Sequence, residues 1–463
     1  MGLSFGSINT GLPKDIVQQL VNAEKIPVQQ MEARKGKIEN KQKLLGEFTK
    51  LVENMRGELL KNKGMRSLRE LKVTNDSDII TVTTDKNVAM PGKYNLEVTQ
   101  LAQKSSAFSN GVEDKDKTYV GVGYLKCYLP NGDTKEIYID EEHSSLSGIA
   151  KLINADESLG MRANVINDGS GSDEPWRLVM ALNETGDGEK AEFPYIYLVD
   201  GEIDLYLEQE RKAQDAKIKL DGFEIEVPSN TVTDLIPGVT INLKKAKPGE
   251  EINFEIKEDV EAIAGKIETL VTNVNAVLKF IKEQNALDEK SDTSQTLGGD
   301  STLQSIESRI RNVMFTSIAT DYGSKRIGDI GITFQRDGLL KFDKDKFSSE
   351  MSANYKMVAQ LLVGNFPTNG KPRSEGFIDR LEQTGSFATA PPSGILHTRK
   401  QGLKRTADQI DQQIANKNRM IAQKEEILKA KFARLEETIS RIRTQGAGLA
   451  GMAQAGNPVQ QLG

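Results

Sequence analysis

The chain has 463 residues, 28% of them charged, with 61 Lys and Arg against 67 Asp and Glu and a formal net charge of −6. That length can hold about two to four domains with cores of their own. The single cysteine, Cys127, excludes an intramolecular disulfide, and with only His143 and His397 as imidazoles a Cys/His zinc site is not expected. The sequence contains no run of 18 apolar residues, so we expect no membrane insertion.

The first twelve residues are rich in Gly, Ser and Asn. They lack the charged region, the apolar core and the cleavage site of a secretory signal peptide. If the protein works outside the cell, we expect it to leave by a route that reads no cleaved signal.

From Pro13 to about Lys63 the sequence predicts a helical arm. Residues 15–25 place a first group of apolar side chains on one face: Ile16, Val17, Leu20 and Val21. Pro27 should kink the arm or start a second helix, because it has no N–H and disfavours helix before it. Beyond it, apolar residues recur every seven positions at Met31, Ile38, Leu45, Val52 and Leu59, with Phe48 and Met55 at the alternate position. This spacing predicts a coiled-coil seam.

Three glycines interrupt this arm, at Gly36, Gly46 and Gly57. Each weakens an isolated helix by about 1 kcal/mol relative to alanine. We therefore expect the arm to need a partner to stay helical.

Between the arms the apolar period changes to two, which is typical of strands with one buried face. Strands are predicted at residues 81–84, 94–98, 124–129, 135–139 and 239–243. The clearest hairpin joins residues 216–220 to residues 223–227 through Asp221-Gly222, which favours a two-residue turn. That turn places Leu220 opposite Phe223, so the apolar residues of both strands share a face. Residues 146–155 predict a short helix.

The helical period returns at Val260 and runs to Ile281. A second helix is predicted to open with the capping-box pattern Ser301-Thr302-Leu303-Gln304 and to continue to Val313. A third is predicted to be capped by Asp343, to pass through Leu361 and to end at Gly364.

From Arg399 to Arg443 the sequence predicts a second helical arm. Apolar residues recur every seven positions at Ala407, Ile414, Ile421, Leu428, Leu435 and Ile442. The companion position is polar at Asp411, Asn418 and Glu425, then apolar at Phe432 and Ile439. Beyond Arg443 the sequence is rich in Gly, Gln and Ala, and we expect it to be flexible. The two seams fit a hairpin within the chain as well as contacts with other molecules, and both can coexist.

Charge separates the arms from the middle. Residues 14–72 carry 14 Lys and Arg against 8 Asp and Glu, and residues 399–443 carry 12 against 6. Residues 73–398 carry 35 against 53, a net charge of −18. Such a pattern concerns partners and solubility, and two ordinary solvated faces would also produce it. Nucleic acid is not an expected partner, because the basic arms lack interleaved aromatic residues.

Catalytic and cofactor motifs are weak in this sequence. Gly364 and Gly370-Lys371 resemble a phosphate loop, but five residues separate the glycines where four are required. Residues 168–173 hint at a calcium loop, but Asp173 stands where glycine is needed, so a surface turn is the better interpretation. We therefore expect no catalytic residue, no cofactor, no metal and no enzyme activity.

Five collinear blocks resemble the flagellar filament-capping protein family (FliD, or hook-associated protein 2). They are residues 11–27 (GLPKDIVQQLVNAEKIP), 91–103 (PGKYNLEVTQLAQ), 229–243 (SNTVTDLIPGVTINL), 331–343 (GITF and DGLLKFD) and the long C-terminal helix. The block at 229–243 is the most specific. The chain departs from the family's pattern at Pro13, at the glycines of the first arm and in its Gly-rich end.

The resemblance implies an extracellular protein at the distal tip of the bacterial flagellum. It implies type III export, a ring-like homo-oligomer, and flagellin, hook–filament junction proteins, the export apparatus and a chaperone as partners. The expected fold is α+β and multidomain: terminal α-helical coiled-coil arms and a helical rod domain, with inserted antiparallel β-rich head domains. An adhesin that uses the acidic head, an enzyme with a hydrolytic head, and another flagellar axial protein such as a hook–filament junction protein are the alternatives.

The expected domains follow this division of the chain. They are 1–42 (N-terminal leg), 43–70 and 259–434 (rod), 71–107 and 212–258 (proximal head), 108–211 (distal head) and 435–463 (C-terminal leg and tail). The residues expected to contact flagellin or to form the coiled-coil seam are Val17, Leu20, Val21, Leu428, Phe432, Leu435, Ile439 and Ile442.

Overall fold

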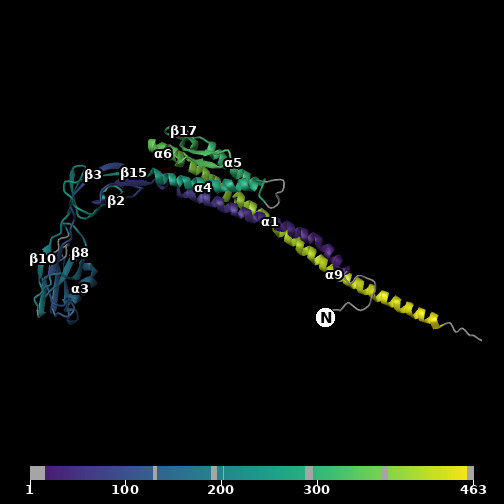
Figure 1. Ribbon diagram of the computed structural model, residues 1–463, viewed down its shortest axis with the longest axis horizontal. Coiled ribbons are helices and arrows are strands. Elements are labelled where there is room, and N and C mark those ends of the chain that lie inside the picture. The colour runs from purple at the N-terminus through teal and green to yellow at the C-terminus, as the bar shows by residue number, and fades with distance from the viewer. Residues whose placement is uncertain are drawn as a thin grey trace, which may run out of the picture. The chain divides into compact units, whose positions relative to one another are not determined.

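The computed structural model describes residues 16–128, 133–188, 195–201, 203–286, 296–365 and 374–455. The chain forms two compact units (Figure 1): unit 1 comprises residues 1–68 and 264–463, and unit 2 comprises Arg69–Ile263. Helices dominate unit 1 and antiparallel sheets dominate unit 2, which confirms the α+β multidomain class. The finer domain boundaries stay predictions.

Unit 1 is built on two long helices, α1 (Ile16–Lys61) and α9 (Ile395–Ala455). They lie side by side in Figure 1, where α1 is purple and α9 is yellow. The other α-helices that the described residues of unit 1 form are α2 (Met65–Leu68), α4 (Val260–Asn285, which begins in unit 2), α5 (Ser301–Phe315), α6 (Lys344–Ala353), α7 (Tyr355–Val363) and α8 (Phe377–Thr389). Two short hairpins, β16 (Ile318–Thr320) with β17 (Gly323–Lys325) and β18 (Ile332–Phe334) with β19 (Leu340–Phe342), complete the unit.

Both arms are more continuous than their sequences predict. Helix α1 runs through Pro27 without starting a second helix. Helix α9 continues past Arg443 to Ala455, so the segment directly after Arg443 is helical, and its flexibility stays a prediction. Long helices tolerate a single unfavourable residue where neighbouring turns are held by tertiary packing, as α1 is by α9 around Pro27.

The inner half of α1 packs into a dense core. Leu45, Phe48 and Val52 have exposed fractions of 0%, and the ring of Phe48 stacks on that of Phe280 from α4 with centroids 5.2 Å apart. The same end of α1 is tied to α8 by an ion pair with a mostly buried carboxylate. Arg56 Nε lies 3.0 Å from Glu382 Oε1.

Three details of the helices differ from the sequence-based predictions. The side chain of Asp300, rather than Ser301, caps α5 by accepting the Thr302 N–H. The third predicted helix is broken in two at Asn354, whose side chain caps α7. The predicted Asp343 cap and the end at Gly364 are confirmed. Helix α8 was not predicted.

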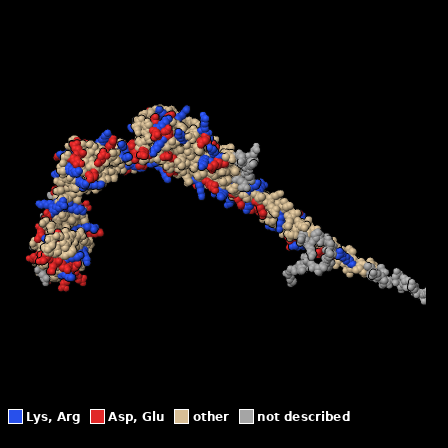
Figure 2. Space-filling model, viewed as in Figure 1, with Lys and Arg blue, Asp and Glu red and all other residues tan. Residues whose placement is uncertain are grey.

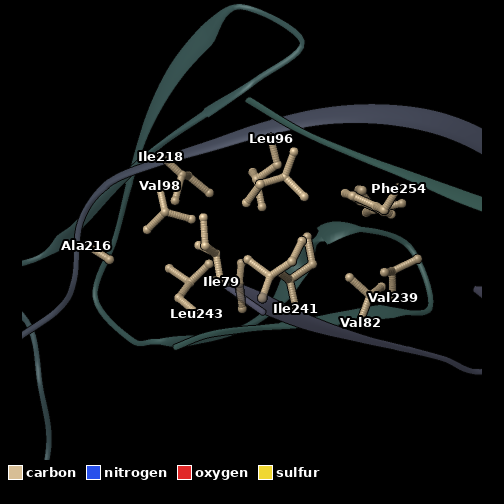
Figure 3. Packing of buried hydrophobic residues seen from close by; sticks show 14 of the residues in the cluster. Ile79, Val82, Leu96, Val98, Ala216, Ile218, Val239, Ile241, Leu243 and Phe254 are labelled. Atoms are coloured by element: carbon tan, nitrogen blue, oxygen red, sulfur yellow. The ribbon is translucent and has the colours of Figure 1, made fainter. Parts of the chain in front are cut away.

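Unit 2 contains a pair of facing sheets that share one core. The first sheet has the order β1 (Leu71–Asn75), β15 (Glu251–Glu258), β3 (Gly92–Gln100), β11 (Ala216–Leu220) and β12 (Phe223–Val227). The second has the order β13 (Thr231–Ile236), β14 (Val239–Leu243) and β2 (Ile80–Thr84). Figure 3 shows Leu96 and Ile218 of the first sheet facing Ile241 and Leu243 of the second.

The predicted hairpin between β11 and β12 forms with the expected register, and Leu220 lies opposite Phe223. Asp221 and Gly222 adopt φ angles of 49° and 87°, as a two-residue primed turn requires. Phe223 departs from the expected buried face, because its side chain is 75% exposed at the tip of the hairpin.

A second core in unit 2 lies between two further sheets and helix α3 (Leu146–Ala155), which confirms the predicted helix. One sheet has the order β10 (Leu207–Arg211), β4 (Ser106–Ser109), β8 (Trp176–Leu182) and β7 (Met161–Asn167). The other has the order β6 (Thr134–Ile139), β5 (Val122–Tyr128) and β9 (Tyr195–Asp200). Residues 129–132 lie outside the described residues, but the strands predicted on either side of them pair with each other as β5 and β6.

Candidate partner-binding site on the terminal arms

Helices α1 and α9 pair in an antiparallel sense, and ion pairs between them fix the register. Lys35 Nζ lies 2.8 Å from Asp411 Oδ1, and Glu24 pairs with both Lys417 and Lys424. Moving toward the N-terminus of α1 thus means moving toward the C-terminus of α9. Position 16 of α1 therefore lies opposite about position 430 of α9.

These contacts shift the titration of the paired groups. The hydrogen bond from Lys424 lowers the pKa of Glu24, and the hydrogen bond to Asp411 raises the pKa of Lys35. Both shifts favour the charged forms. Because the side chains are largely solvated, we regard the pairs as setting register more than supplying stability.

A small apolar cluster accompanies the ion pairs. Val21, Val28 and Ile421 are buried there, with exposed fractions of 5% or less. Val17 and Ile414 are partly buried and pack against the same cluster. This cluster has only three buried members, whereas the inner half of α1 buries seam residues such as Leu45 and Phe48 completely. We call residues 16–28 of α1, together with the part of α9 that they contact, the outer arm. It is therefore the more weakly packed part of the helical pair.

The seam residues predicted on α9 lie at and beyond the register end of α1. Leu428, Phe432 and Ile439 are half-buried, while Leu435 and Ile442 are 43% and 62% exposed. Residues 431–455 extend about 38 Å past the start of the described part of α1. A regular apolar stripe begins just before this overhang and continues along it, and we call it the tip stripe: Leu428, Phe432, Leu435, Ile439 and Ile442.

The eight predicted contact residues thus fall into two groups. Val17 and Val21 pack within the arm against α9, and Leu20 on the same helix is 42% exposed. The other five form the tip stripe. The roles of all eight in partner contacts stay predictions.

Sequence reasoning missed the cross-helix ion pairs. It identified Asp411 as a polar interruption of the seam, yet this residue pairs with Lys35 on the facing helix. Opposite charges at Glu24 and at Lys417 and Lys424 were the signal that could have revealed the register. Reading them requires knowing that the two arms pair antiparallel.

The segment that resembles a calcium loop forms a structural contact in the fold. The carboxylate of Asp168 binds Arg177, with Oδ2 2.6 Å from Nε, within the surface turn expected there. Within the described residues, no group of three His, Cys, Asp or Glu side chains could hold a metal ion. None of the described helices is long and apolar enough to cross a membrane. Gly370 and Lys371 lie outside the described residues.

Comparisons with known proteins agree with these features. Residues 11–105 match the family model of the flagellar hook-associated protein 2 N-terminus, and residues 213–444 match that of its C-terminus. The A-type flagellar hook-associated protein 2 of Pseudomonas aeruginosa is 28% identical, covering 98% of this chain and 97% of the relative. The B-type protein of P. aeruginosa PAO1 is 26% identical over 93% of each chain.

The fold has a solved counterpart. The D1-D2-D3 domains of the flagellar cap protein FliD from Escherichia coli superpose with a TM-score of 0.60 and 23% identity, covering 78% of this chain and 100% of that chain. These matches favour neither the adhesin nor the hook–filament junction alternative. The chain belongs to the flagellar hook-associated protein 2 family, the structural cap proteins of the bacterial flagellum.

Proposed function

We propose that several copies of this protein cap the tip of a growing bacterial flagellar filament outside the cell, order the insertion of exported flagellin and prevent its loss. Family membership supports this role. The single structural observation that carries the proposal is the tip stripe, an apolar heptad seam on α9 that extends beyond the described part of α1.

The tip stripe has the chemistry of a site for another helix. Its residues alternate at intervals of three and four, which presents one continuous apolar edge to a partner. Lys429, Lys431 and Arg443 flank this edge together with a single acidic residue, Glu436, and this net positive border favours a partner helix with acidic residues beside its own seam. Helical ends of flagellin and of the hook–filament junction proteins are the partners we propose. We also propose that the export apparatus and a chaperone handle the chain before assembly, without a cleaved signal peptide.

Growth requires that such contacts break whenever a subunit is inserted. Gly36, Gly46 and Gly57 lie in α1 with nothing within 4 Å of an added Cβ, so no close packing requires glycine there. They lower the helical stability of the arm, which suits contacts worth only a few kcal/mol each. An incoming flagellin subunit would then displace one arm while contacts between copies hold the cap together.

The test measures flagellin in the culture medium of a deletion strain and counts filaments by electron microscopy. We expect abundant shed flagellin and bare hooks, with both defects corrected by the full chain. Complementation with the triple variant Phe432→Ala, Leu435→Ala, Ile442→Ala should leave most flagellin in the medium, because the tip stripe loses its apolar surface.

The matched control is Ile427→Ala, which removes a 55% exposed apolar side chain from α9 outside the seam. It should restore filaments fully. Normal filaments in the deletion strain would contradict the capping role. Full rescue by the triple variant would show that capping does not require the tip stripe, and it would leave the capping role itself intact.

A further inference from the structure

Tyrosines gather on one face of one small sheet of this protein. Five of the ten tyrosines belong to β5 and β9 or to the neighbouring β6: Tyr124, Tyr128, Tyr138, Tyr195 and Tyr197. In the strand register Tyr124 lies directly between Tyr138 and Tyr197, and Tyr195 lies opposite Lys126. Since side chains alternate along a strand, Tyr124, Tyr128, Tyr138 and Tyr197 point to the same side of this sheet.

That side of the sheet faces away from the core. On the opposite side Leu125 and Ile139 are fully buried against α3 and its neighbours. Tyr124, Tyr138 and Tyr197 have exposed fractions of 47%, 53% and 59%. Exposed tyrosines give a large, rigid contact area at low entropic cost, and they are enriched in protein interfaces. We call this surface the tyrosine face.

The surroundings of the tyrosine face are acidic. Residues 122–142 and 195–204, which hold its strands and the following turns, carry two lysines against eight Asp or Glu. Lys126 is already engaged, 3.5 Å from Glu136 and 5.8 Å from the ring of Tyr128. Aromatic rings in a negative field attract guanidinium and ammonium groups, so the face fits a basic partner.

The chain itself contains such a surface. Unit 2 carries 21 Lys and Arg against 38 Asp and Glu, a net charge of −17, whereas unit 1 carries 40 against 29, a net charge of +11. Figure 2 shows basic side chains distributed along the helices of unit 1. Contact between the tyrosine faces of two copies would instead bring two strongly negative units together.

We propose that the tyrosine face is an interface between copies of this chain, and that it binds the basic helical surface of unit 1 in a second copy. This inference rests on the proposed cap, in which copies must hold one another while arms exchange. Because the contact is heterologous, it generates a ring or an open chain of subunits rather than a two-fold dimer.

The test is sedimentation velocity of the full chain over a concentration series, at about 50 mM and about 500 mM NaCl. We expect the wild type to self-associate and to do so less at high salt, because screening weakens contacts between opposite charges. The triple variant Tyr124→Ala, Tyr138→Ala, Tyr197→Ala should raise the dissociation constant about tenfold or more.

Two controls isolate the cause. Tyr206→Ala removes a 57% exposed tyrosine of unit 2 outside the tyrosine face and should leave the dissociation constant unchanged. The triple Tyr→Phe variant keeps the rings and should stay within about threefold of the wild type. If the triple alanine variant misfolds by circular dichroism, Tyr197→Ala alone should still raise the dissociation constant.

A wild type that remains monomeric up to its solubility limit would overturn the proposal. So would triple and single alanine variants that associate normally, or an equal loss in Tyr206→Ala. These outcomes are distinguishable from a failure of the capping role, which the flagellin released by the deletion strain measures independently.

Discussion

The inner half of α1 and the tip of α9 share one heptad pattern but differ in what buries it. In the inner half, Leu45 and Phe48 are fully buried, and Phe280 covers part of the seam. At the tip, Leu435 and Ile442 remain 43% and 62% exposed. Heptad spacing therefore identifies an apolar edge without identifying the molecule that covers it. The inner edge serves folding, and we propose that the tip serves assembly.

The largest effect should come from the inner edge. Phe48→Ala should lower the free energy of unfolding of unit 1 by about 3–5 kcal/mol, because it removes a fully buried ring and leaves a cavity beside Phe280. Chemical denaturation, monitored by circular dichroism, measures this free energy of unfolding. Leu60→Ala, on the same helix but 45% exposed, should change stability by less than about 1 kcal/mol. Equal effects for both would show that the inner seam is not the core described here.

Stiffening α1 should have the next largest effect. The double variant Gly46→Ala, Gly57→Ala should stabilise the helix by about 1 kcal/mol per site, because both added methyl groups enter open space. If transient release of the arms limits growth, filaments of this variant should elongate more slowly, as measured by sequential labelling of flagellin. Unchanged elongation in a measurably stabilised variant would reject release as the slow step.

Much of unit 2 could be predicted from local patterns. The turn at Asp221-Gly222 fixes the pairing of Leu220 with Phe223, because a two-residue loop permits a single register. Which of the alternating apolar side chains become buried depends on long-range packing, which the local pattern does not predict. Phe223 alternates correctly, but it stands at the tip of its hairpin, where nothing buries it.

Helix α8 shows the same limit in unit 1. Its sequence includes Gly385, which argues against a helix on propensity alone. In the fold, a Cβ at Gly385 would lie only 3.1 Å from Cβ of Arg56, so this glycine lets α8 approach α1 closely. The candidate site shows the same limit. Its apolar stripe could be predicted from the sequence, whereas the pairing of Glu24 with Lys424 depends on how two distant arms align.

At the tip of α9, a substitution should impair capping without lowering the stability of the fold. Phe432→Ala should change the free energy of unfolding by less than about 1 kcal/mol, because this half-buried side chain lies past the register end of α1. It should still increase flagellin shed into the medium. Denaturation and an immunoblot of the culture supernatant measure the two quantities. If Phe432→Ala lowered the free energy of unfolding as much as Phe48→Ala does, Phe432 would belong to a core. The contrast between the inner edge and the tip would then disappear.

The smallest effect concerns the ion pairs that align the outer arm. The pKa of Glu24 is lowered in the folded chain by Lys424, so its contribution is present above the unfolded pKa and is lost as the pH falls through the folded one. Glu24→Gln should therefore speed amide hydrogen exchange in residues 16–28 at about pH 7, and the difference from the wild type should shrink toward about pH 3.

Comparing both proteins at the same pH cancels the intrinsic pH dependence of exchange. Glu39→Gln is the matched control, because Glu39 pairs with Lys35 within α1 rather than with α9. It should leave exchange in residues 16–28 unchanged. If Glu24→Gln also leaves it unchanged at neutral pH, the pairs of Glu24 do not align residues 16–28, and the small apolar cluster and the Lys35–Asp411 pair set the register without them. Glu24 would then contribute nothing to the pH dependence of arm release.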